Sequence, residues 1–306
     1  MLTPDHYDYV PMPHRKPLKW PGGHRMAVIF TINCEFWPMT WDKPEPLYPG
    51  GPATIPHVLP GNVPDYANWT WREYGQRVGV WRLFEEFDRS GVPTTCTINA
   101  LTARERTPIV EAANERGWEI LAHNFVQTQM LNELSGDPDG ERDVIKRTLD
   151  AYADVIGRPA RGWLSSSMRS THETPHLLKE LGFDFMACYL NDDQPYMMRT
   201  RHGPLVQIPY SNDINDFAVF ARGAMAASGA FERFRDEFDI LYEESAMSGR
   251  MMNIGLHPHV MGRGFAIKAL REFIAYVKDI DGVWFPKREE ISDWYAENHA
   301  SHIAPK

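Results

Sequence analysis

Short apolar runs alternate along the chain with segments in which apolar residues recur every three or four positions. Runs of about four to eight apolar residues indicate buried strands, whereas the longer spacing indicates amphipathic helices. Strands are expected at residues 26–33, 94–98, 118–122, 161–165, 184–188, 205–209, 251–256 and 282–285. Helices are expected at residues 74–91, 104–116, 138–156, 174–181, 229–248, 264–279 and 287–298. This alternation is typical of a β/α fold.

The expected strands and helices favour one architecture over another. Eight strands with interposed helices indicate a closed or nearly closed α/β barrel rather than an open doubly wound sheet. No GxGxxG sequence follows the first strand, so a dinucleotide site is not expected. The helix at 74–91 places Val80, Phe84 and Phe87 on one face and ends at Gly91, a residue that commonly terminates helices. Its aromatic stripe is interpreted as core.

Two segments depart from the alternation. Residues 36–73 are rich in Pro, Gly and Trp without a sustained period, and they are expected to form a long ordered loop that caps the barrel. This loop is interpreted as a packed cover, a lid over a pocket or an oligomer contact. Residues 1–25 are expected to form an arm around the barrel, and residues 1–306 are expected to form a single domain.

The composition and charge of the chain disfavour some classes of binding partner. The chain has 306 residues, 43% hydrophobic and 24% charged, which suffices for one large core. A formal net charge of -9 disfavours nucleic acid and anionic membranes, because phosphate binding needs clustered Lys and Arg. No run of about 20 apolar residues and no apolar core of a signal peptide is present, so a cytoplasmic location is expected. Three widely spaced cysteines, Cys34, Cys96 and Cys188, are expected to be buried thiols.

Polar residues follow nearly every expected strand. In chain order these are Asn33 and Glu35, Asn99, His123 and Asn124, Ser165, Ser166 and Ser167, Asn191, Asp192 and Asp193, Tyr210, Asn212 and Asp213, and His257 and His259. Barrel enzymes build their sites from the carboxyl ends of successive strands, so these residues predict an active site there rather than a series of solvated turns.

Individual roles follow from side-chain chemistry, with alternatives left open. Side chains alternate along a strand, so Asn33 and Glu35 face the interior if Cys34 faces the helices. Glu35 is a candidate general base or metal ligand, or a salt-bridged carboxylate. His123 is a candidate site residue or a core histidine, and His257 can give a proton to a leaving nitrogen.

Other polar residues have structural alternatives as well. His259 and Arg263 either order the turn after the seventh strand or hold an anion. Of Asp192 and Asp193, which can cap a turn, only one would then point inward.

Seven stretches of the chain carry a family resemblance: TINCEFW, YGQRVGVWRLFEEF, GWEILAHN, RGWLSSS, NDDQPY, IPYSNDIND and IGLHPHVMGR. Together they resemble the polysaccharide deacetylase (NodB-like) superfamily, and most closely its branch of cofactor-independent PuuE-type allantoinases and cyclic imide hydrolases. The resemblance spans about residues 14–298. It implies a deformed (β/α) barrel, hydrolysis of a carbon–nitrogen bond in an amide, ureide or imide, and often a homotetramer.

The chain departs from the superfamily's usual metal site. The first carboxylate position is Asn33, the second is Glu35, and the usual histidine pair is reduced to His123 followed by Gln127. An amide cannot act as a base, and a catalytic zinc normally has three protein ligands. No cofactor is therefore expected; if zinc or another divalent metal is bound, Glu35 and His123 are its expected ligands. The stretch GWLSSS replaces the GWYTGR of the allantoinase branch, and His259 is an addition.

The expected reaction is attack of water on a ring carbonyl, with Glu35 or a neighbouring carboxylate taking the proton. His123, Asn124 or Asn33 would hold the oxyanion, and His257 would protonate the departing nitrogen. The expected catalytic residues are Glu35, His123, His257, Asp192 and Asn33. The expected substrate-binding residues are Asn124, Trp37, Ser165, Ser166, Asp193, Tyr210, Asn212, His259 and Arg263.

Three functions remain open at this point. The first is a hydrolase of a small cyclic amide, ureide or imide, the second a carbohydrate N- or O-deacetylase, and the third a non-catalytic protein that binds a small ring. The expected partner is a small-molecule substrate, and a homo-oligomer, dimer or tetramer, is expected. Trp37, Trp41 and Trp69 are expected to exclude water and to stack on a flat ring.

Overall fold

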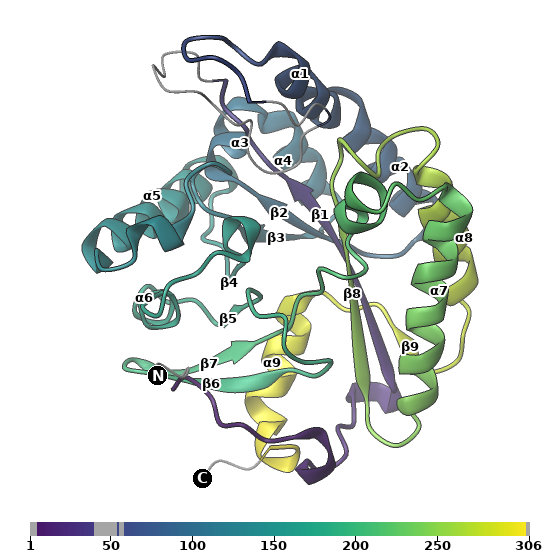
Figure 1. Ribbon diagram of the computed structural model, residues 1–306. Coiled ribbons are helices and arrows are strands. Elements are labelled where there is room, and N and C mark those ends of the chain that lie inside the picture. The colour runs from purple at the N-terminus through teal and green to yellow at the C-terminus, as the bar shows by residue number, and fades with distance from the viewer. Residues whose placement is uncertain (1–4, 40–53, 55–57, 304–306) are drawn as a thin grey trace.

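The computed structural model describes residues 5–39, 54 and 58–303, and within them nine strands form one sheet (Figure 1). The strand order is β6-β7-β5-β4-β3-β2-β1-β8, and β9 pairs with β1 off this path. The strands are β1 Met26–Cys34, β2 Thr95–Ile98, β3 Glu119–Ala122, β4 Gly162–Trp163, β5 Phe185–Met186, β6 Tyr196–Thr200, β7 Gly203–Gln207, β8 Arg250–Leu256 and β9 Val283–Trp284.

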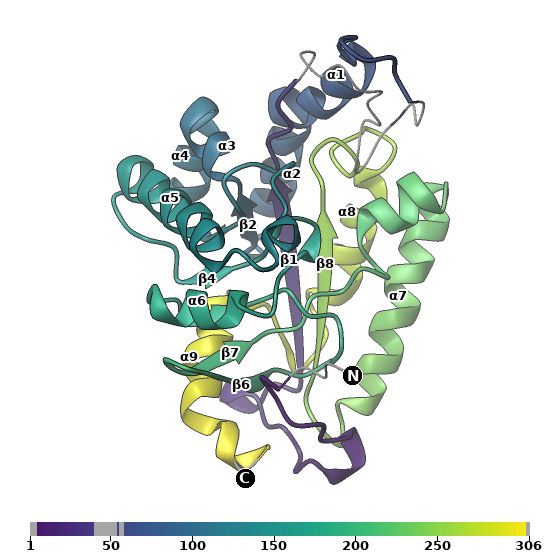
Figure 2. The same ribbon diagram turned by 60° about the vertical axis from the view of Figure 1, so that its left-hand side comes forward.

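All neighbouring strands run parallel except the hairpin of β6 and β7. The sheet curls into a half-barrel, with the hairpin at one edge and β8 at the other (Figures 1 and 2). This is the deformed barrel that the sequence predicted. Because these strands are parallel, the carboxyl ends of β1, β3, β4 and β8 all lie at the same end of the half-barrel. Barrel enzymes carry their active sites at this end.

Helices cover the outside of the curled sheet. In Figure 1, α3, α4 and α5 lie on one side and α7 and α8 on the other, beside β8. The helices are α1 Tyr66–Tyr74, α2 Val80–Ser90, α3 Ala100–Glu105, α4 Thr107–Glu115, α5 Pro138–Ile156, α6 Thr174–Glu180, α7 Ala227–Glu244, α8 Ile267–Val277 and α9 Arg288–Asn298, with π-helical turns at Gly75–Gly79 and Phe217–Arg222.

The core between sheet and helices is aromatic on the side of β1. Phe30 of β1 packs edge-on against Phe87 of α2 and Phe273 of α8, and all three are almost completely buried. Such edge-on pairs add about 1 kcal/mol each to the free energy gained by burial alone. The stripe expected on the helix at 74–91 is therefore core.

The interior of the curled sheet is polar instead. Thr31 of β1 donates to the side chain of Asn253 in β8 over 2.8 Å, and it accepts from Arg288 over 2.8 Å. Glu119 of β3 accepts from the backbone of Arg288 over 3.1 Å. Asn33 lies two residues beyond Thr31, so the alternation of the strand directs it into the same interior, as expected.

Three elements differ from the expectation. The edge strand β6 was not expected, because its residues are only partly buried and carry no continuous apolar run. The helix expected at 104–116 is two helices: Arg106, with a φ of -134°, separates them, and the second begins at Thr107 with Pro108 in its first turn. Helix α1 begins inside the segment 36–73 that was expected to be a loop, and the side chain of Asp65 caps it by accepting from Asn68 N.

The described part of the amino-terminal arm packs against the amino ends of the central strands. Leu18 N donates to Ser248 Oγ over 2.9 Å, and Trp20 Nε1 donates to the carbonyl of Arg250 over 3.0 Å. The division into one domain with an arm and a capping loop stays a prediction. Residues 40–53 and 55–57 of that loop, Trp41 among them, lie outside the described residues.

The three cysteines are buried free thiols, as expected. No helix in the ranges that the structure describes has both the length and the apolar character needed to cross a bilayer.

Candidate active site

A cavity of about 700 Å³ opens at the carboxyl ends of the strands. Side chains from distant parts of the sequence line it because parallel strands end at the same edge. Six of them are Glu35 after β1, His123 after β3, Ser167 after β4, Tyr210 and Asn212 after β7, and His257 after β8. All six were among the polar strand ends that the sequence predicted to form the site, although Ser167 was given no individual role.

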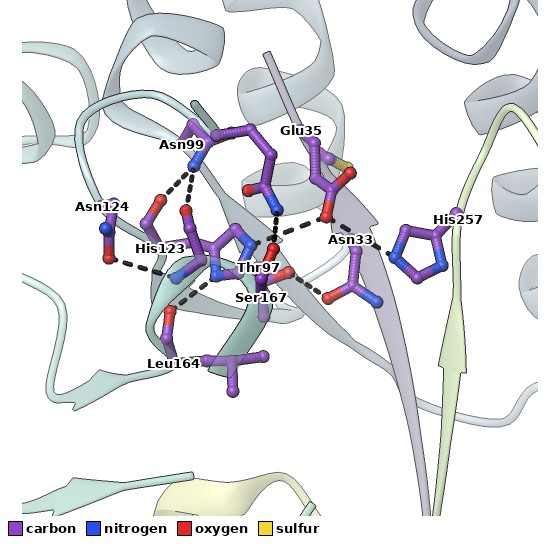
Figure 3. Close-up of polar contacts among 12 residues, drawn as sticks. Asn33, Glu35, Thr97, Asn99, His123, Asn124, Leu164, Ser167 and His257 are labelled. Carbon is purple, nitrogen blue, oxygen red and sulfur yellow. Dashed lines mark hydrogen bonds and ion pairs between the residues drawn. The ribbon is translucent and has the colours of Figure 1, made fainter. Parts of the chain in front are cut away.

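Glu35 lies between two imidazoles (Figure 3). Its Oε1 is 3.5 Å from His257 Nε2 and 3.8 Å from His123 Nε2, and its Oε2 accepts from Trp37 Nε1 over 3.1 Å. Burial alone would raise the pKa of this carboxyl, but His257 and His123 outweigh it and hold the pKa well below its ordinary value. Glu35 is therefore ionised at neutral pH.

His257 is held by a carboxylate that the sequence argument missed. Asp216, fully buried before the π-helical turn, accepts from His257 Nδ1 over 2.6 Å and from the backbone N of the same residue over 2.6 Å. Burial lowers the pKa of His257, but Asp216 and Glu35 outweigh it and raise the pKa to about 10. The ring is an imidazolium that directs Nε2–H toward Glu35 and the cavity.

The ring of His123 also reaches the cavity, but its hydrogen bonds differ from those of His257. Its Nδ1 donates to the carbonyl of Leu164 over 2.6 Å, which leaves the lone pair of the neutral ring on Nε2. Among the described residues this buried Nε2 has no hydrogen-bond partner. The space between it and Glu35 therefore suits a water molecule or a substrate N–H.

Asn33 and Tyr210 form a second polar pair in the cavity wall. Asn33 accepts from Thr97 Oγ1 over 2.7 Å and donates to Tyr210 Oη over 3.1 Å, and Asn215 Nδ2 donates to the same Oη over 3.2 Å. Burial raises the pKa of Tyr210 above its ordinary value, so the hydroxyl keeps its proton. That proton has no acceptor within the described ranges, and Tyr210 can donate it to a substrate oxygen.

Gly255 makes this position of Tyr210 possible. A Cβ at residue 255 would lie 2.1 Å from Tyr210 Oη and 2.5 Å from Asn215 Nδ2. Any side chain there would displace the hydroxyl from the cavity wall.

The structure does not bring the expected Asp192 and Asp193 to the cavity. Asp192 forms a two-pronged ion pair with Arg15 of the arm, at 2.7 and 2.6 Å. The carbonyl of Asp193 accepts from Met251 N at the start of β8, which lies at the amino ends of the strands, opposite the cavity.

Three other expected residues lie behind the cavity wall. Ser165 Oγ accepts from Trp163 Nε1 over 2.9 Å, and Asn124 accepts from Ser166 N over 3.2 Å while donating to the carbonyl of Gln129. These bonds shape the loop after β4. Within that loop Ser167, at a left-handed φ of 54°, is the serine that lines the cavity.

His259 and Arg263 join the loop after β8 to α1. The His259 ring packs edge-on against Trp71 at 4.7 Å between centroids, and burial lowers its pKa to about 3. Arg263 donates to the carbonyl of His259 over 3.1 Å and stacks over the Tyr74 ring at 3.6 Å. Neither residue lines the cavity, and both lie behind His257.

Known proteins resemble the chain in sequence and overall fold, although no family model matches it. A Schizosaccharomyces pombe protein designated a polysaccharide deacetylase is 28% identical over 305 residues, which cover 92% of this chain and 93% of that protein. The structure of a probable polysaccharide deacetylase from Pseudomonas aeruginosa PAO1 superposes with a TM-score of 0.81 at 29% identity, and covers 95% of each chain. That of Puue allantoinase gives 0.80 at 27% identity, again over 95% of each.

The chain is thus a homologue of the polysaccharide deacetylases, with their NodB-like fold. Its homologues, a protein designated an allantoinase among them, are hydrolases that act on carbon–nitrogen bonds.

The deacetylase homology raises the question of a divalent metal in the cavity. Of the residues present, Glu35 and His123 have suitable atoms, but Asn33 and Gln127 offer only neutral amides, and His257 is protonated. In the described ranges, no group of three His, Cys, Asp or Glu with ligand atoms within 4.8 Å of one another occurs in this cavity. The donor set therefore does not fit a catalytic zinc with three protein ligands.

Proposed function

We propose that the protein hydrolyses a carbon–nitrogen bond in a small cyclic amide, ureide or imide, using a carboxylate and two histidines. The observation that carries the proposal is Glu35 held between the imidazole rings of His123 and His257 in one cavity, with the His257 ring charged. Opening such a ring needs a base for water, a donor for the oxyanion and an acid for the leaving nitrogen. One group for each task lines this cavity.

The first step activates water. A water molecule between Glu35 and His123 gives a proton to the free Nε2 of His123, and its hydroxide forms a bond to the ring carbonyl carbon. The negative charge of Glu35 stabilises the imidazolium that results. Glu35, whose resting pKa is depressed, is a poor acceptor in this step.

The second step breaks the ring. Tyr210 donates its proton in a hydrogen bond to the oxyanion, and the charged His257 Nε2 gives its proton to the departing nitrogen as the carbon–nitrogen bond breaks. His257 is then neutral, so the pKa of Glu35 rises. The carboxylate can now pass the proton of His123 back to His257, which restores the starting state.

The cavity suits a small substrate. Its volume of about 700 Å³ lies within the usual range for small-molecule sites. The expected Trp37 does not line this cavity: it is 5% exposed, donates to Glu35 Oε2 over 3.1 Å, and lies with Trp69 around a separate small pocket of about 10 Å³. A polymer substrate would need an open groove instead.

Two guanidinium groups indicate that the ring carries an acidic group. Arg169 and Arg222 line the cavity and are exposed at its mouth. Neither forms an ion pair with a carboxylate in the part of the chain that the structure describes. Since the whole chain has a net charge of -9, unpaired positive groups here suit an anionic substrate.

Carbohydrate N- or O-deacetylation is the second candidate, because the relatives from Schizosaccharomyces pombe and Pseudomonas aeruginosa bear the deacetylase name. Binding of a ring without catalysis is the third, because Asn33 and Gln127 replace the acid and the histidine usual in the superfamily. A cytoplasmic homo-oligomer, dimer or tetramer, remains part of the proposal on the resemblance, and light scattering with the purified protein tests its size.

The proposal is tested by turnover of matched compounds. Dihydrouracil and dihydroorotate share a ring and differ by a carboxylate, as do hydantoin and hydantoin-5-acetate; allantoin, succinimide and an N-acetylated sugar complete the panel. Ring opening, faster for the acidic member of a pair, is expected. Release of acetate only from the sugar would establish the deacetylase. Tight ring binding without turnover would establish the binding protein.

A further inference from the structure

Three histidines that the proposed reaction does not use gather at another place. His6 comes from the arm, His172 from the loop before α6, and His176 from the first turn of α6. Each offers one ring nitrogen, and these three nitrogens lie within 4.8 Å of one another. The ring centroids are 4.5 Å apart for His6 and His172, and 5.0 Å for His6 and His176.

His6 has the hydrogen bonds of a metal ligand. Its Nε2 lies 3.0 Å from the carbonyl of His172, an acceptor, so this nitrogen carries the proton. The lone pair is then on Nδ1, which is buried and has no partner among the described residues. Metal-bound histidines almost always donate their other N–H to a carbonyl or carboxylate in this way.

The other two rings complete a partly formed site. The side chain of His172 is 56% exposed, and its Nε2 is 3.6 Å from Asp5 Oδ1. His176 is buried, and its Nδ1 accepts from Arg201 N over 3.1 Å, a bond that coordination would replace or reorient.

We propose that His6, His172 and His176 form a binding site for Zn²⁺ or a similar divalent transition ion, with water as the fourth ligand. Three imidazoles select such ions over Mg²⁺ and Ca²⁺, which prefer oxygen. A zinc–nitrogen distance of about 2.1 Å places ligand nitrogens about 3.4 Å apart in a tetrahedron, so small side-chain rotations close the site.

The ion would fasten the amino-terminal arm to the barrel. The carbonyl of His6 already accepts from Arg199 N of β6 over 2.6 Å, and Asp8 pairs with the same arginine over 3.0 Å. Zinc adds a link from His6 to α6. The site is distinct from the candidate active site: His6 and His172 line a separate cavity of about 720 Å³, which shares only Met168 and Leu190 with the other.

The test is zinc binding by untagged protein after removal of metals by chelation. Zinc is titrated against a chromophoric competitor, with wild type, His6→Ala, His172→Ala and the control His202→Ala. His202 is also an exposed histidine near α6, but it lies outside the cluster. Wild type and His202→Ala are expected to bind one ion, and the two cluster variants to bind it at least tenfold more weakly.

Thermal unfolding gives an independent readout. Zinc at about 100 times its dissociation constant is expected to raise the Tm of wild type and His202→Ala by about 2–5 °C and to leave His172→Ala unchanged. His172 is exposed, so its replacement is compatible with folding, which circular dichroism verifies. Absence of a site of unit stoichiometry in wild type, or equal zinc affinity in His172→Ala, would overturn the proposal.

Discussion

The molecule contains two groups of histidines whose surroundings differ in one respect. In the candidate active site, buried carboxylates flank the rings: Asp216 and Glu35 raise the pKa of His257 to about 10. In the cluster at the arm, burial outweighs the nearby carboxylates of Asp5 and Glu173, and the pKa values of His6 and His176 fall. The same side chain is thus prepared for proton transfer in one place and for metal binding in the other.

The largest expected effect comes from removing the carboxylate at the centre of the first group. Glu35→Gln keeps the shape and eliminates the charge that stabilises both imidazolium ions, so kcat is expected to fall by about 10³. Steady-state kinetics with the ring substrate that wild type hydrolyses fastest measure this fall in kcat. Glu85→Gln, an exposed change on α2, is the control. A rate within twofold of wild type would remove Glu35 from the mechanism.

Tyr210→Phe tests the oxyanion donor. Loss of a single hydrogen bond to the oxyanion is expected to lower kcat by about 10²-fold while the KM changes little, because the bond forms in the transition state. The companion Gly255→Ala displaces the same hydroxyl through its Cβ and should have a similar effect on kcat. A change confined to KM in both variants would assign Tyr210 to substrate binding only.

Asp216→Asn makes His257 more like the histidines at the arm. Without this carboxylate the pKa of His257 falls from about 10 toward its ordinary 6.5. Because the reaction needs the charged ring, the decline of kcat/KM on the alkaline side should begin at lower pH. The rate at pH 7 should fall by up to about fourfold, because a ring with the ordinary pKa is still about one quarter charged at that pH. An alkaline limb at the wild-type position would show that another group gives the proton.

Part of the candidate active site could be predicted from the sequence alone. Glu35, His123 and His257 were found because each follows a parallel strand directly, and such strands end at one edge. Asp192 was misplaced by this rule because β5 ends at Met186, and the intervening loop carries Asp192 back to the arm. Asp216 lies well beyond β7, so only its long-range bond to His257 reveals it.

The histidines at the arm carried no sequence signal of comparable strength. His172 and His176 are four residues apart near a helix start, but their partner His6 is distant in sequence, and its position depends on how the arm docks on β6. The free lone pair of His6 becomes visible only once its bond to the carbonyl of His172 is known. Local sequence patterns therefore predicted the helices and strands. The contacts that each side chain makes depend instead on how distant segments of the chain dock.

A smaller effect is expected at the mouth of the cavity. Arg169→Gln and Arg222→Gln should each raise the KM for dihydroorotate by about two- to fivefold and leave the KM for dihydrouracil unchanged, because an exposed ion pair contributes at most about 1 kcal/mol. High salt should reduce the difference in wild type. An equal rise in KM for both compounds would mean that the arginines shape the cavity rather than recognise charge.

Chelation is expected to have the smallest effect on turnover, and it separates the two groups most directly. It should remove zinc from the arm, lower the Tm and leave kcat within twofold of its starting value, because the active-site donor set lacks a third ligand. Metal content, Tm and kcat are measured on the same samples. Chelation could instead abolish kcat. If zinc then restores kcat in His172→Ala as well as in wild type, the ion required for turnover is bound by Glu35 and His123. Activity that returns only in proteins with an intact cluster would instead mean that docking of the arm controls the active site across the wall formed by Met168 and Leu190.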